Sequence, residues 1–422
     1  MDTARNSACQ RYRARWLFPG LRAPLENATI DVEQGRIVAI APQSDAPARN
    51  LGNVAVIPGL VNAHAHLEFS NLPAPIEPRL PFTAWLTSLI AHRRANPAER
   101  VTAIDRGSCE CVQAGTTVVG EIATAGWQPA LVPQPGLQVV AFHEALGLSP
   151  DRKPEQLRLA RAHVERAAAK DTAAFVWGLS PHAPYTVHPE LFHGLVDLAA
   201  EYAAPLAMHL AETQSELELL DQGTGEFVAF LRDLGVWQPN AIDRGSRPLD
   251  YLAGLARLPR VLVIHANYLA DDEINYLAGR ENFSVVYCPR THAGFGHTPH
   301  RWREMQDRGV RVALGTDGRG SNPDLSLWNE LLFLRRQFPQ VEPSRLLRMG
   351  TLAGAEALGL ARDTGDLTPG KSADLAVVGL PDSGGRDPYT LLFASENRIV
   401  ATMRAGRWLA GPPCEPAAGV QP

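Results

Sequence analysis

Polar residues that can bind a metal ion stand at the ends of several short apolar segments of this chain. His64 and His66 close the first segment, and because side chains alternate along an extended strand, both imidazoles leave from one face. Alone, this pair is weak evidence, since two buried histidines satisfied by hydrogen bonds give the same pattern. Three later apolar segments end in matching groups, His209, His265 and Asp317. Imidazoles with one carboxylate and an open position for water form the donor set of a catalytic Zn²⁺ or Fe²⁺.

The elements that must position these residues alternate regularly along the middle of the chain. Eight apolar, strand-like segments alternate with stretches of helical character, and they cover residues 62–66, 116–121, 137–142, 174–179, 205–209, 261–265, 284–288 and 311–315. This alternation predicts an α/β protein with a (β/α)₈ TIM barrel, in which side chains at the carboxyl ends of the strands form the active site. An open, doubly wound sheet of eight strands is the alternative.

The two ends of the chain are dominated by strands and turns. Residues 28–32 and 37–40 are apolar runs on either side of a turn that contains Gly35, which predicts a hairpin. Residues 374–378, 399–404 and 407–409 again have the character of strands. Neither end is large enough for a good core alone. We therefore expect one small discontinuous β domain, residues 1–57 with 364–422, beside a barrel of residues 58–363.

Composition argues against several classes of function. The chain of 422 residues has a formal net charge of −5, and no basic run is interleaved with aromatic residues, so nucleic acid is not an expected partner. The five cysteines are scattered, which favours a reducing cytoplasm over a disulfide framework. No apolar run reaches the ~20 residues of a membrane span, so we expect no association with a membrane.

Lysine is rare in this chain, where Lys153, Lys170 and Lys371 are the three lysines. A Schiff-base nucleophile, a phosphate-binding lysine or a carbamylated lysine between two metals must therefore use one of these three or be absent.

Four stretches, in their order and spacing, resemble the amidohydrolase superfamily, specifically its cytosine deaminase, S-adenosylhomocysteine deaminase and triazine chlorohydrolase branch. They are residues 57–68 (IPGLVNAHAHLE), 180–187 (SPHAPYTV), 208–213 (MHLAET) and 314–317 (LGTD). Residues 365–375 are similar to the segment that returns these proteins to their β-sandwich. The resemblance covers residues 16–409 and implies a TIM barrel with a small discontinuous β-sandwich domain from the two chain ends.

The resemblance implies that His64, His66, His209 and Asp317 bind one divalent metal, Zn²⁺ first and Fe²⁺ as the alternative. It also implies that Glu212 is the general acid and base. The other explanation of Glu212 is an acidic residue at the start of a helix, where it interacts favourably with the helix dipole.

The same resemblance makes His265 a catalytic residue that orients the attacking group, lets Asp317 share in proton transfer, and places His182 against the substrate. Relatives with two metals hold the second with a carbamylated lysine near the fourth strand. That segment, residues 174–179, contains no lysine, and Lys170 precedes it. One metal is therefore expected.

The expected enzyme is a hydrolase acting on carbon–nitrogen bonds other than peptide bonds, of the cyclic amidine deaminase class. A metal-bound hydroxide would attack the amino-bearing carbon of an aminated heterocycle, such as a purine or an adenosine-derived nucleoside, and release ammonia. The alternative is a triazine-type chlorohydrolase or N-dealkylase, or a cyclic amide hydrolase, with the same mononuclear site. A non-catalytic barrel is disfavoured because the ligand and acid–base residues are all present. We expect a small-molecule substrate and, as in many relatives, a homodimer.

Substrate contacts are harder to assign. Trp85 either stacks on a substrate ring or packs on a helix face, and Glu144 either accepts a hydrogen bond from the substrate or pairs with an arginine. Arg290 and His292 lie in residues 288–297, which depart from the family's more usual Asn-Pro-x-Ser-Asn, and we expect them to face the pocket and favour an anionic substrate. Five other histidines are expected to be solvated on helices or loops, namely His92, His163, His188, His193 and His300.

Overall fold

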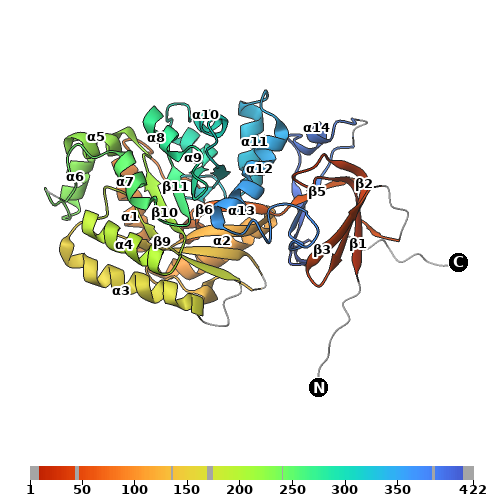
Figure 1. The fold of residues 1–422 in the computed structure, drawn as a ribbon, viewed down its shortest axis with the longest axis horizontal. Helices are drawn as coiled ribbons and strands as arrows, with labels where there is room; N and C mark the ends of the chain where they lie inside the picture. The colour runs from red at the N-terminus through yellow and green to blue at the C-terminus, as the bar shows by residue number, and fades with distance from the viewer. Residues whose placement is uncertain are drawn as a thin grey trace, which may run out of the picture.

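The computed structural model describes residues 9–42, 47–134, 136–168, 174–239, 241–382 and 385–411. Two sheets organise these residues, a parallel sheet from the middle of the chain and a mostly antiparallel sheet from its two ends. Figure 1 shows the two bodies side by side, with the helices gathered around the parallel sheet.

The parallel sheet is a closed barrel. Its strands are β6 (Leu60–His66), β7 (Thr116–Ala123), β8 (Gln138–Ala145), β9 (Phe175–Pro181), β10 (Leu206–Leu210), β11 (Val261–His265), β12 (Phe283–Tyr287), β13 (Val312–Leu314) and β14 (Asp317–Gly318). Only Gly315 and Thr316 separate β13 from β14, so these are two pieces of the eighth strand. β14 pairs with β6, with Asp317 opposite Ala65. The ring is therefore complete, and the predicted TIM barrel is confirmed.

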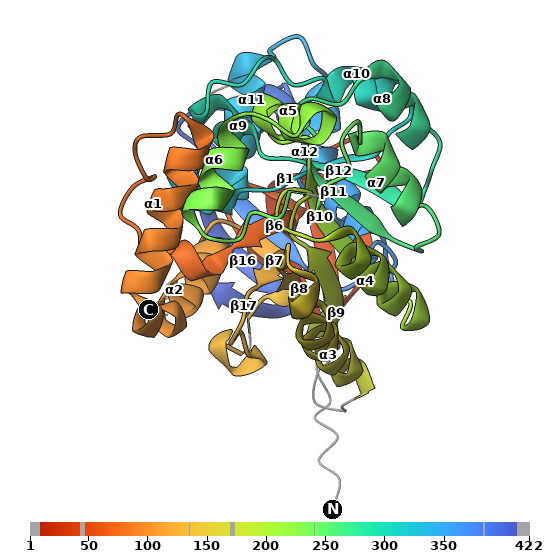
Figure 2. The same cartoon turned by 90° about the vertical axis from the view of Figure 1, so that its left-hand side faces the viewer.

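Helices cover the outside of this barrel, and Figure 2 shows β6 to β12 in the middle of them. They are α1 (Phe82–Ala95), α2 (Arg100–Gln113), α3 (Lys153–Val164), α4 (Pro189–Glu201), α5 (Gln214–Gln222), α6 (Glu226–Asp233), α7 (Pro248–Leu255), α8 (Asp271–Leu277), α9 (Pro289–Gly294), α10 (Trp302–Asp307), α11 (Leu327–Gln337), α12 (Pro343–Met349) and α13 (Leu352–Leu358). A further helix, α14 (Pro388–Leu392), follows later in the chain. α5 and α6 both lie between β10 and β11 in the chain, whereas α14 lies beside the second sheet.

The second sheet joins strands from both chain ends. Its order is β17-β16-β15-β5-β1-β2-β3, with β4 beside β1. The bounds are β1 (Gln10–Leu17), β2 (Leu25–Glu33), β3 (Arg36–Ala41), β4 (Arg49–Asn50), β5 (Val54–Pro58), β15 (Leu375–Gly379), β16 (Ile399–Arg404) and β17 (Arg407–Ala410). β2 and β3 form the predicted hairpin. The domain boundaries at residues 57 and 364 stay a proposal, because β5 runs directly into β6 through Gly59.

The side chains of β11 alternate between the inside of the barrel and the layer between strands and helices. Leu262 and Ile264 belong to the inner core of the barrel, whereas Val261 and Val263 pack in the layer between strands and helices. The two-residue period of a strand explains this alternation. Apolar burial on both faces also explains why these strands are continuous apolar runs in the sequence.

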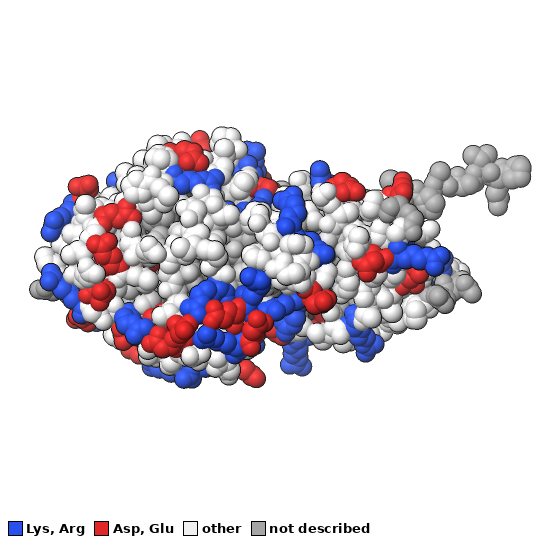
Figure 3. All heavy atoms as spheres, turned by 90° about the horizontal axis from the view of Figure 1, so that it is seen from above, with Lys and Arg blue, Asp and Glu red and all other residues white. Residues whose placement is uncertain are grey.

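The charges on the face of the molecule drawn in Figure 3 are mixed, with acidic and basic side chains interspersed. No helix among the described residues is long and apolar enough to cross a membrane.

His163 and His300 are buried, so the prediction that both are solvated is wrong. His163, near the end of α3, donates from Nε2 to the backbone oxygen of Ala141 at 2.9 Å and lies edge-on to the Trp177 ring. The physical reason is that α3 packs against the outside of the barrel, where its inner face meets β8 and β9. Burial lowers the pKa of His163 to about 3.

This burial predicts an acid-sensitive contribution to stability. Because the folded pKa of His163 lies below the unfolded value of about 6.5, the unfolded chain binds more protons between these values and stability falls as the pH drops. Urea unfolding at pH values from 7 to 4.5 measures the slope. The variant His163→Gln, which keeps a donor for Ala141 but does not titrate, should lose up to about 1.4 kcal/mol less per pH unit than the wild type. The exposed His193→Gln is the matched control, and equal slopes for all three proteins would contradict the prediction.

Candidate metal-dependent active site

Four histidines and one aspartate meet at the carboxyl ends of the barrel strands. His64 and His66 come from β6, His209 from β10, His265 from β11 and Asp317 from β14. The Nε2 atoms of His64 and His66 both lie 3.5 Å from Oδ1 of Asp317. The ligand atoms of two overlapping groups, His64 with His209 and His265, and His64 with His66 and Asp317, lie within 4.8 Å of one another. The structure thus brings together all the residues that the sequence proposes as metal ligands, with His265 beside them.

The donor atoms are suited to a divalent cation. Both ring nitrogens of His64 and Nδ1 of His66 are buried with no hydrogen-bond partner among the described residues, which is costly for polar groups away from water. His209 donates from Nδ1 to the backbone oxygen of His182 at 3.1 Å, which leaves its Nε2 lone pair for the centre. Three imidazoles and a carboxylate fit a Zn²⁺ or Fe²⁺ ion with a further position for water.

Hydrogen bonds from the side chain of Asn62 hold β6 against the junction of β13 and β14. Asn62 donates from Nδ2 to Oγ1 of Thr316 at 2.8 Å, and its Oδ1 accepts from the backbone nitrogens of His64 and Thr316. A Cβ atom at Gly315 would lie 2.9 Å from Cβ of His64, so glycine permits this close approach. Asp317 itself has φ of 59°, a left-handed conformation that is uncommon for residues other than glycine.

The two oxygens of the Asp317 carboxylate have different surroundings. Oδ1 faces His64 and His66, whereas Oδ2 accepts a hydrogen bond from Oγ of Ser321 at 2.6 Å. Ser321 is in turn 3.0 Å from Oγ1 of Thr291. This bond fixes the rotation of the carboxylate, so that one oxygen points to the metal ligands.

His265 reaches the centre through an unusual turn of the chain. Strand alternation alone would direct its side chain outward with Val261 and Val263, but φ is 67° at His265 and 54° at Ala266. The ring centroid of His265 consequently lies 5.4 Å from that of His209. His300 holds this turn by donating from Nε2 to the backbone oxygen of His265 at 2.9 Å.

Glu212 stands three residues after His209, where β10 has ended. Its Oε1 is 3.4 Å from Nε2 of His265, and burial, reinforced by the Asp317 and Glu216 carboxylates, raises its pKa well above the ordinary value. Burial lowers the pKa of His265 to about 3, so this imidazole is neutral at neutral pH. Glu212 therefore lies where a group that takes up and returns protons is needed.

Glu216, which the sequence analysis missed, positions Glu212. Its fully buried carboxylate accepts from the backbone nitrogens of Ala211 at 2.9 Å and Glu212 at 2.8 Å. Thr213 begins α5 as its N-cap and accepts from the backbone nitrogen of Glu216. A threonine three residues before a glutamate is a helix-start signal, but the sequence does not show that this glutamate bonds further back.

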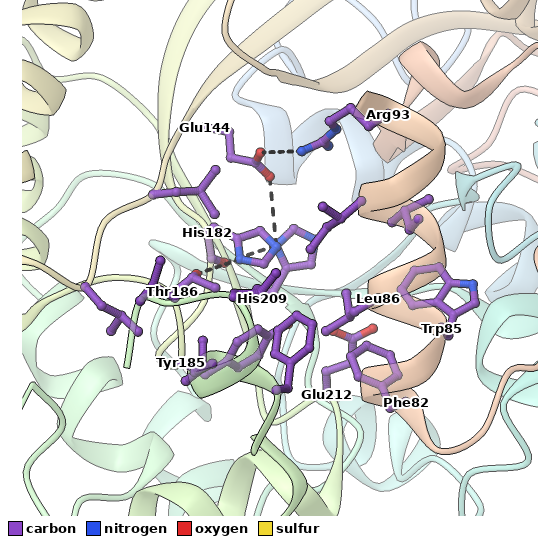
Figure 4. Close-up of a pocket in the computed structure, with 18 of the residues that line it drawn as sticks. Phe82, Trp85, Leu86, Arg93, Glu144, His182, Tyr185, Thr186, His209 and Glu212 are labelled. Atoms are coloured by element: carbon purple, nitrogen blue, oxygen red, sulfur yellow. Dashed lines mark hydrogen bonds and ion pairs between the residues drawn. The ribbon is translucent and has the colours of Figure 1, made fainter. Parts of the chain in front are cut away.

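A cavity of about 670 Å³ opens above these residues. Its wall is mostly apolar and includes Phe82, Trp85, Leu86 and Ile90 of α1, as Figure 4 shows in part. Trp85 packs against Phe82 and Phe295 and also lines the cavity, while its Nε1 donates to the backbone oxygen of Gly320. Its stacking on a substrate ring stays a proposal. Glu144 and His182 also line the cavity.

Arg290 and His292, expected to face the substrate, are not among the residues that line this cavity. Arg290 donates from Nε to Glu330 at 2.6 Å and from Nη2 to Asp324 at 2.6 Å, and His292 donates from Nε2 to the backbone oxygen of Thr298. A fully buried carboxylate such as Glu330 requires a paired cation, which is the physical reason for the position of Arg290.

The pair of Arg290 and Glu330 supports the loop after Asp317 indirectly. Asn322 donates from Nδ2 to both Oε1 of Glu330 and the backbone oxygen of Thr316. The sequence places Arg290 near the site but does not show which acid it meets, because Glu330 is 40 residues away in α11.

None of the lysines that the structure describes contacts the metal ligands. Lys153 pairs with Glu190, and Lys371 bonds Asp366 and two backbone oxygens. Lys170 lies outside the described residues.

Comparison with known proteins agrees with this arrangement. Residues 55–409 match the model of the amidohydrolase family. The chain is 31% identical over 420 residues to 5-methylthioadenosine/S-adenosylhomocysteine deaminase of Nitratidesulfovibrio vulgaris, covering 92% of this chain and 89% of that one. It is 30% identical over 345 residues to aminodeoxyfutalosine deaminase of Deinococcus radiodurans, covering 77% and 80%. The crystal structure of an adenosine deaminase from Xanthomonas campestris with bound zinc superposes with a TM-score of 0.80 at 26% identity, covering 96% and 93%.

Removal of one donor should empty the centre. We expect His64→Asn, purified after expression with zinc, to hold less than about a tenth of the metal found in the wild type, because a ligand of the set is lost. Elemental analysis measures this. His182→Asn lies in the same cavity but is not a donor, so it should keep its metal. If His64→Asn kept its full metal content, His64 would not be a metal ligand.

The structure assigns Arg290 to stability and not to substrate contact. Arg290→Met should lower the free energy of unfolding by about 3–5 kcal/mol, because the buried carboxylate of Glu330 loses its cation. Adding Glu330→Leu should recover most of the loss in urea unfolding. If Arg290→Met instead unfolded like the wild type and changed only the KM of a substrate, the original expectation would stand.

Proposed function

The chain belongs to the amidohydrolase family, and on that premise we propose that it is a metal-dependent hydrolytic deaminase that releases ammonia from an amino-bearing purine of a nucleoside. The observation that carries the proposal is the position of Glu212, which is buried beside His265, lines the cavity and lies next to the metal ligands. The names of the deaminases to which the chain is similar support the same reaction.

We assign one Zn²⁺ to His64, His66, His209 and Asp317. A bound metal of this kind supplies a Lewis acid that makes water nucleophilic at neutral pH. The same donors also serve Fe²⁺, so elemental analysis of the purified protein identifies the ion. The absence of a lysine from β9 supports a single metal.

Deamination by water forms one carbon–oxygen bond and breaks the bond between the ring carbon and its exocyclic nitrogen. Two protons must move, one to a ring nitrogen and one to the departing amine. Glu212 can carry both, because its carboxyl group lies beside the metal ligands and burial raises its pKa above the ordinary value, which favours uptake of a proton. Neutral His265, 3.4 Å away, orients the carboxylate. His182 lines the cavity beside His209, with 5.0 Å between the two ring centroids, so it contacts the bound substrate.

The cavity supports a substrate larger than a free base. A volume of about 670 Å³ exceeds the need of a bicyclic ring, and the apolar side chains of α1 suit the faces of a purine and its substituent. The relatives are named for different adenosine derivatives, so we propose a substituted adenosine as the substrate class. The homodimer and the cytoplasmic location expected from the sequence remain proposals.

One substitution tests the reaction and the role of Glu212 together. Wild-type protein should release ammonia from adenosine or a 5′-substituted adenosine, measured by a coupled ammonia assay. Glu212→Gln should keep its metal and lose about a hundred- to ten-thousandfold in kcat, because the group that transfers protons is gone. The matched control is Glu218→Gln, an exposed glutamate of α5, the helix that follows Glu212.

The products decide between this function and the triazine-type alternative. If every amine fails, and chloride, an alkylamine or a ring-opened acid appears from triazines or cyclic amides, the deaminase proposal is wrong. Full activity in Glu212→Gln would contradict the assigned role of that residue.

A further inference from the structure

One wall of the cavity is polar, in contrast to the apolar wall of α1. It consists of Glu144 at the end of β8, His182 just after β9 and Arg93 from the last turn of α1. Figure 4 shows Glu144 between the other two side chains. The Glu144 carboxylate is 4.0 Å from Nη1 of Arg93 on one side and 4.0 Å from Nε2 of His182 on the other.

These two distances are too long for hydrogen bonds. The Glu144 side chain is only 3% exposed, yet no hydrogen bond from any described residue reaches its oxygens. A carboxylate so little exposed is costly to leave without protein donors, and Glu144 lines the cavity. The hydrogen-bonding capacity of Glu144 is therefore open to a molecule in the cavity.

His182 has its own proton directed away from Glu144. Its Nδ1 is 2.7 Å from Oγ1 of Thr186, and that hydroxyl donates to the backbone oxygen of Ala183 at 3.2 Å. The Thr186 oxygen thus accepts from Nδ1 of His182, which leaves Nε2 as an acceptor. Glu144 and His182 therefore present two acceptors to each other, and only donors placed between or beside them can satisfy both.

Arg93 supplies charge to this wall without supplying the missing donor. Its Nη2 donates to Glu68 at 2.6 Å, and its guanidinium lies over the Phe69 ring, so it is anchored away from Glu144. Its Nε is buried without a partner among the described residues. At 4.0 Å Arg93 offsets the negative charge of Glu144, and this favours a neutral ligand at the carboxylate.

The surroundings distinguish between classes of donor. A cationic ammonium group is disfavoured because Arg93, Arg94 and Arg152 all line the cavity, and an anion is disfavoured by Glu144 itself. Two adjacent hydroxyl groups match best, since they offer two neutral donors to the two oxygens of one carboxylate. The ring centroid of His182 lies 5.0 Å from that of His209, so such a group would sit next to the metal ligands.

We propose that Glu144, with His182 beside it, is the site that binds the vicinal hydroxyl groups of the substrate's ribose, and that it thereby selects ribonucleosides and orients the purine over the metal ligands. This inference rests on the proposed function, because it takes the substrate to be a nucleoside. It explains why a carboxylate is kept buried in a wall where Arg93 offsets its charge but donates no hydrogen bond to it.

Equilibrium binding tests this inference apart from turnover. Isothermal titration of the zinc-loaded full-length Glu212→Gln variant compares adenosine with 2′,3′-dideoxyadenosine. We expect adenosine to bind at least about thirtyfold more tightly, because each hydroxyl donates to a buried charged group. Adding Glu144→Gln should weaken adenosine binding about tenfold or more and leave the dideoxynucleoside within about threefold of its original affinity. Thermal unfolding and metal content check that each variant is folded.

Three results would overturn the inference: equal affinities for the two nucleosides, equal weakening of both by Glu144→Gln, or no binding of adenosine at all. The ammonia assay on wild-type protein reports separately on the proposed function. If adenosine and its dideoxy analogue were deaminated with equal kcat/KM, the proposed deaminase activity would stand and the proposed diol site would be wrong. If adenosine bound much more tightly than the dideoxynucleoside but no ammonia were released, the proposed diol site would stand and the proposed deaminase activity would be wrong.

Discussion

The structure depends on one electrostatic constraint, the gathering of several imidazoles and carboxylates with little exposure to solvent. His64 has both ring nitrogens buried without partners among the described residues, and Asp317 and Glu212 lie in the same enclosure. Such a set is stable only when a cation offsets the desolvation and the chain holds each group in place. The surrounding polar residues can be understood as supports for this arrangement.

Those supports act mainly through the backbone. Asn62 clamps the strand that carries His64, Glu216 binds the backbone nitrogen of Glu212, and His300 bonds the backbone oxygen of His265. Each restrains a turn where the chain leaves a strand, which is where small rotations would move a ligand or an acid–base group most. The barrel fold supplies the strand ends, and these bonds determine the direction of the side chains.

The cavity has two different walls above this floor. α1 provides an apolar surface with Trp85, whereas the ends of β8 and β9 provide Glu144 and His182. The proposed nucleoside substrate, with a flat ring and a polar sugar, matches these two surfaces, and in that orientation its reacting carbon faces Glu212. Orientation of this kind is a large part of what an active site contributes to rate.

The sequence by itself determined the barrel, the hairpin and the candidate centre, because apolar strands with polar ends are local patterns, as are the short stretches around His64, His209 and Asp317. It did not determine that His265 turns inward, since its left-handed backbone reverses the alternation that the strand predicts. The sequence also led to the wrong prediction that Arg290 faces the substrate, because its partner Glu330 is distant in the chain. His163 and His300 were predicted to be solvated but are buried. Only the tertiary structure decided these points, because burial and pairing depend on which distant segments pack together.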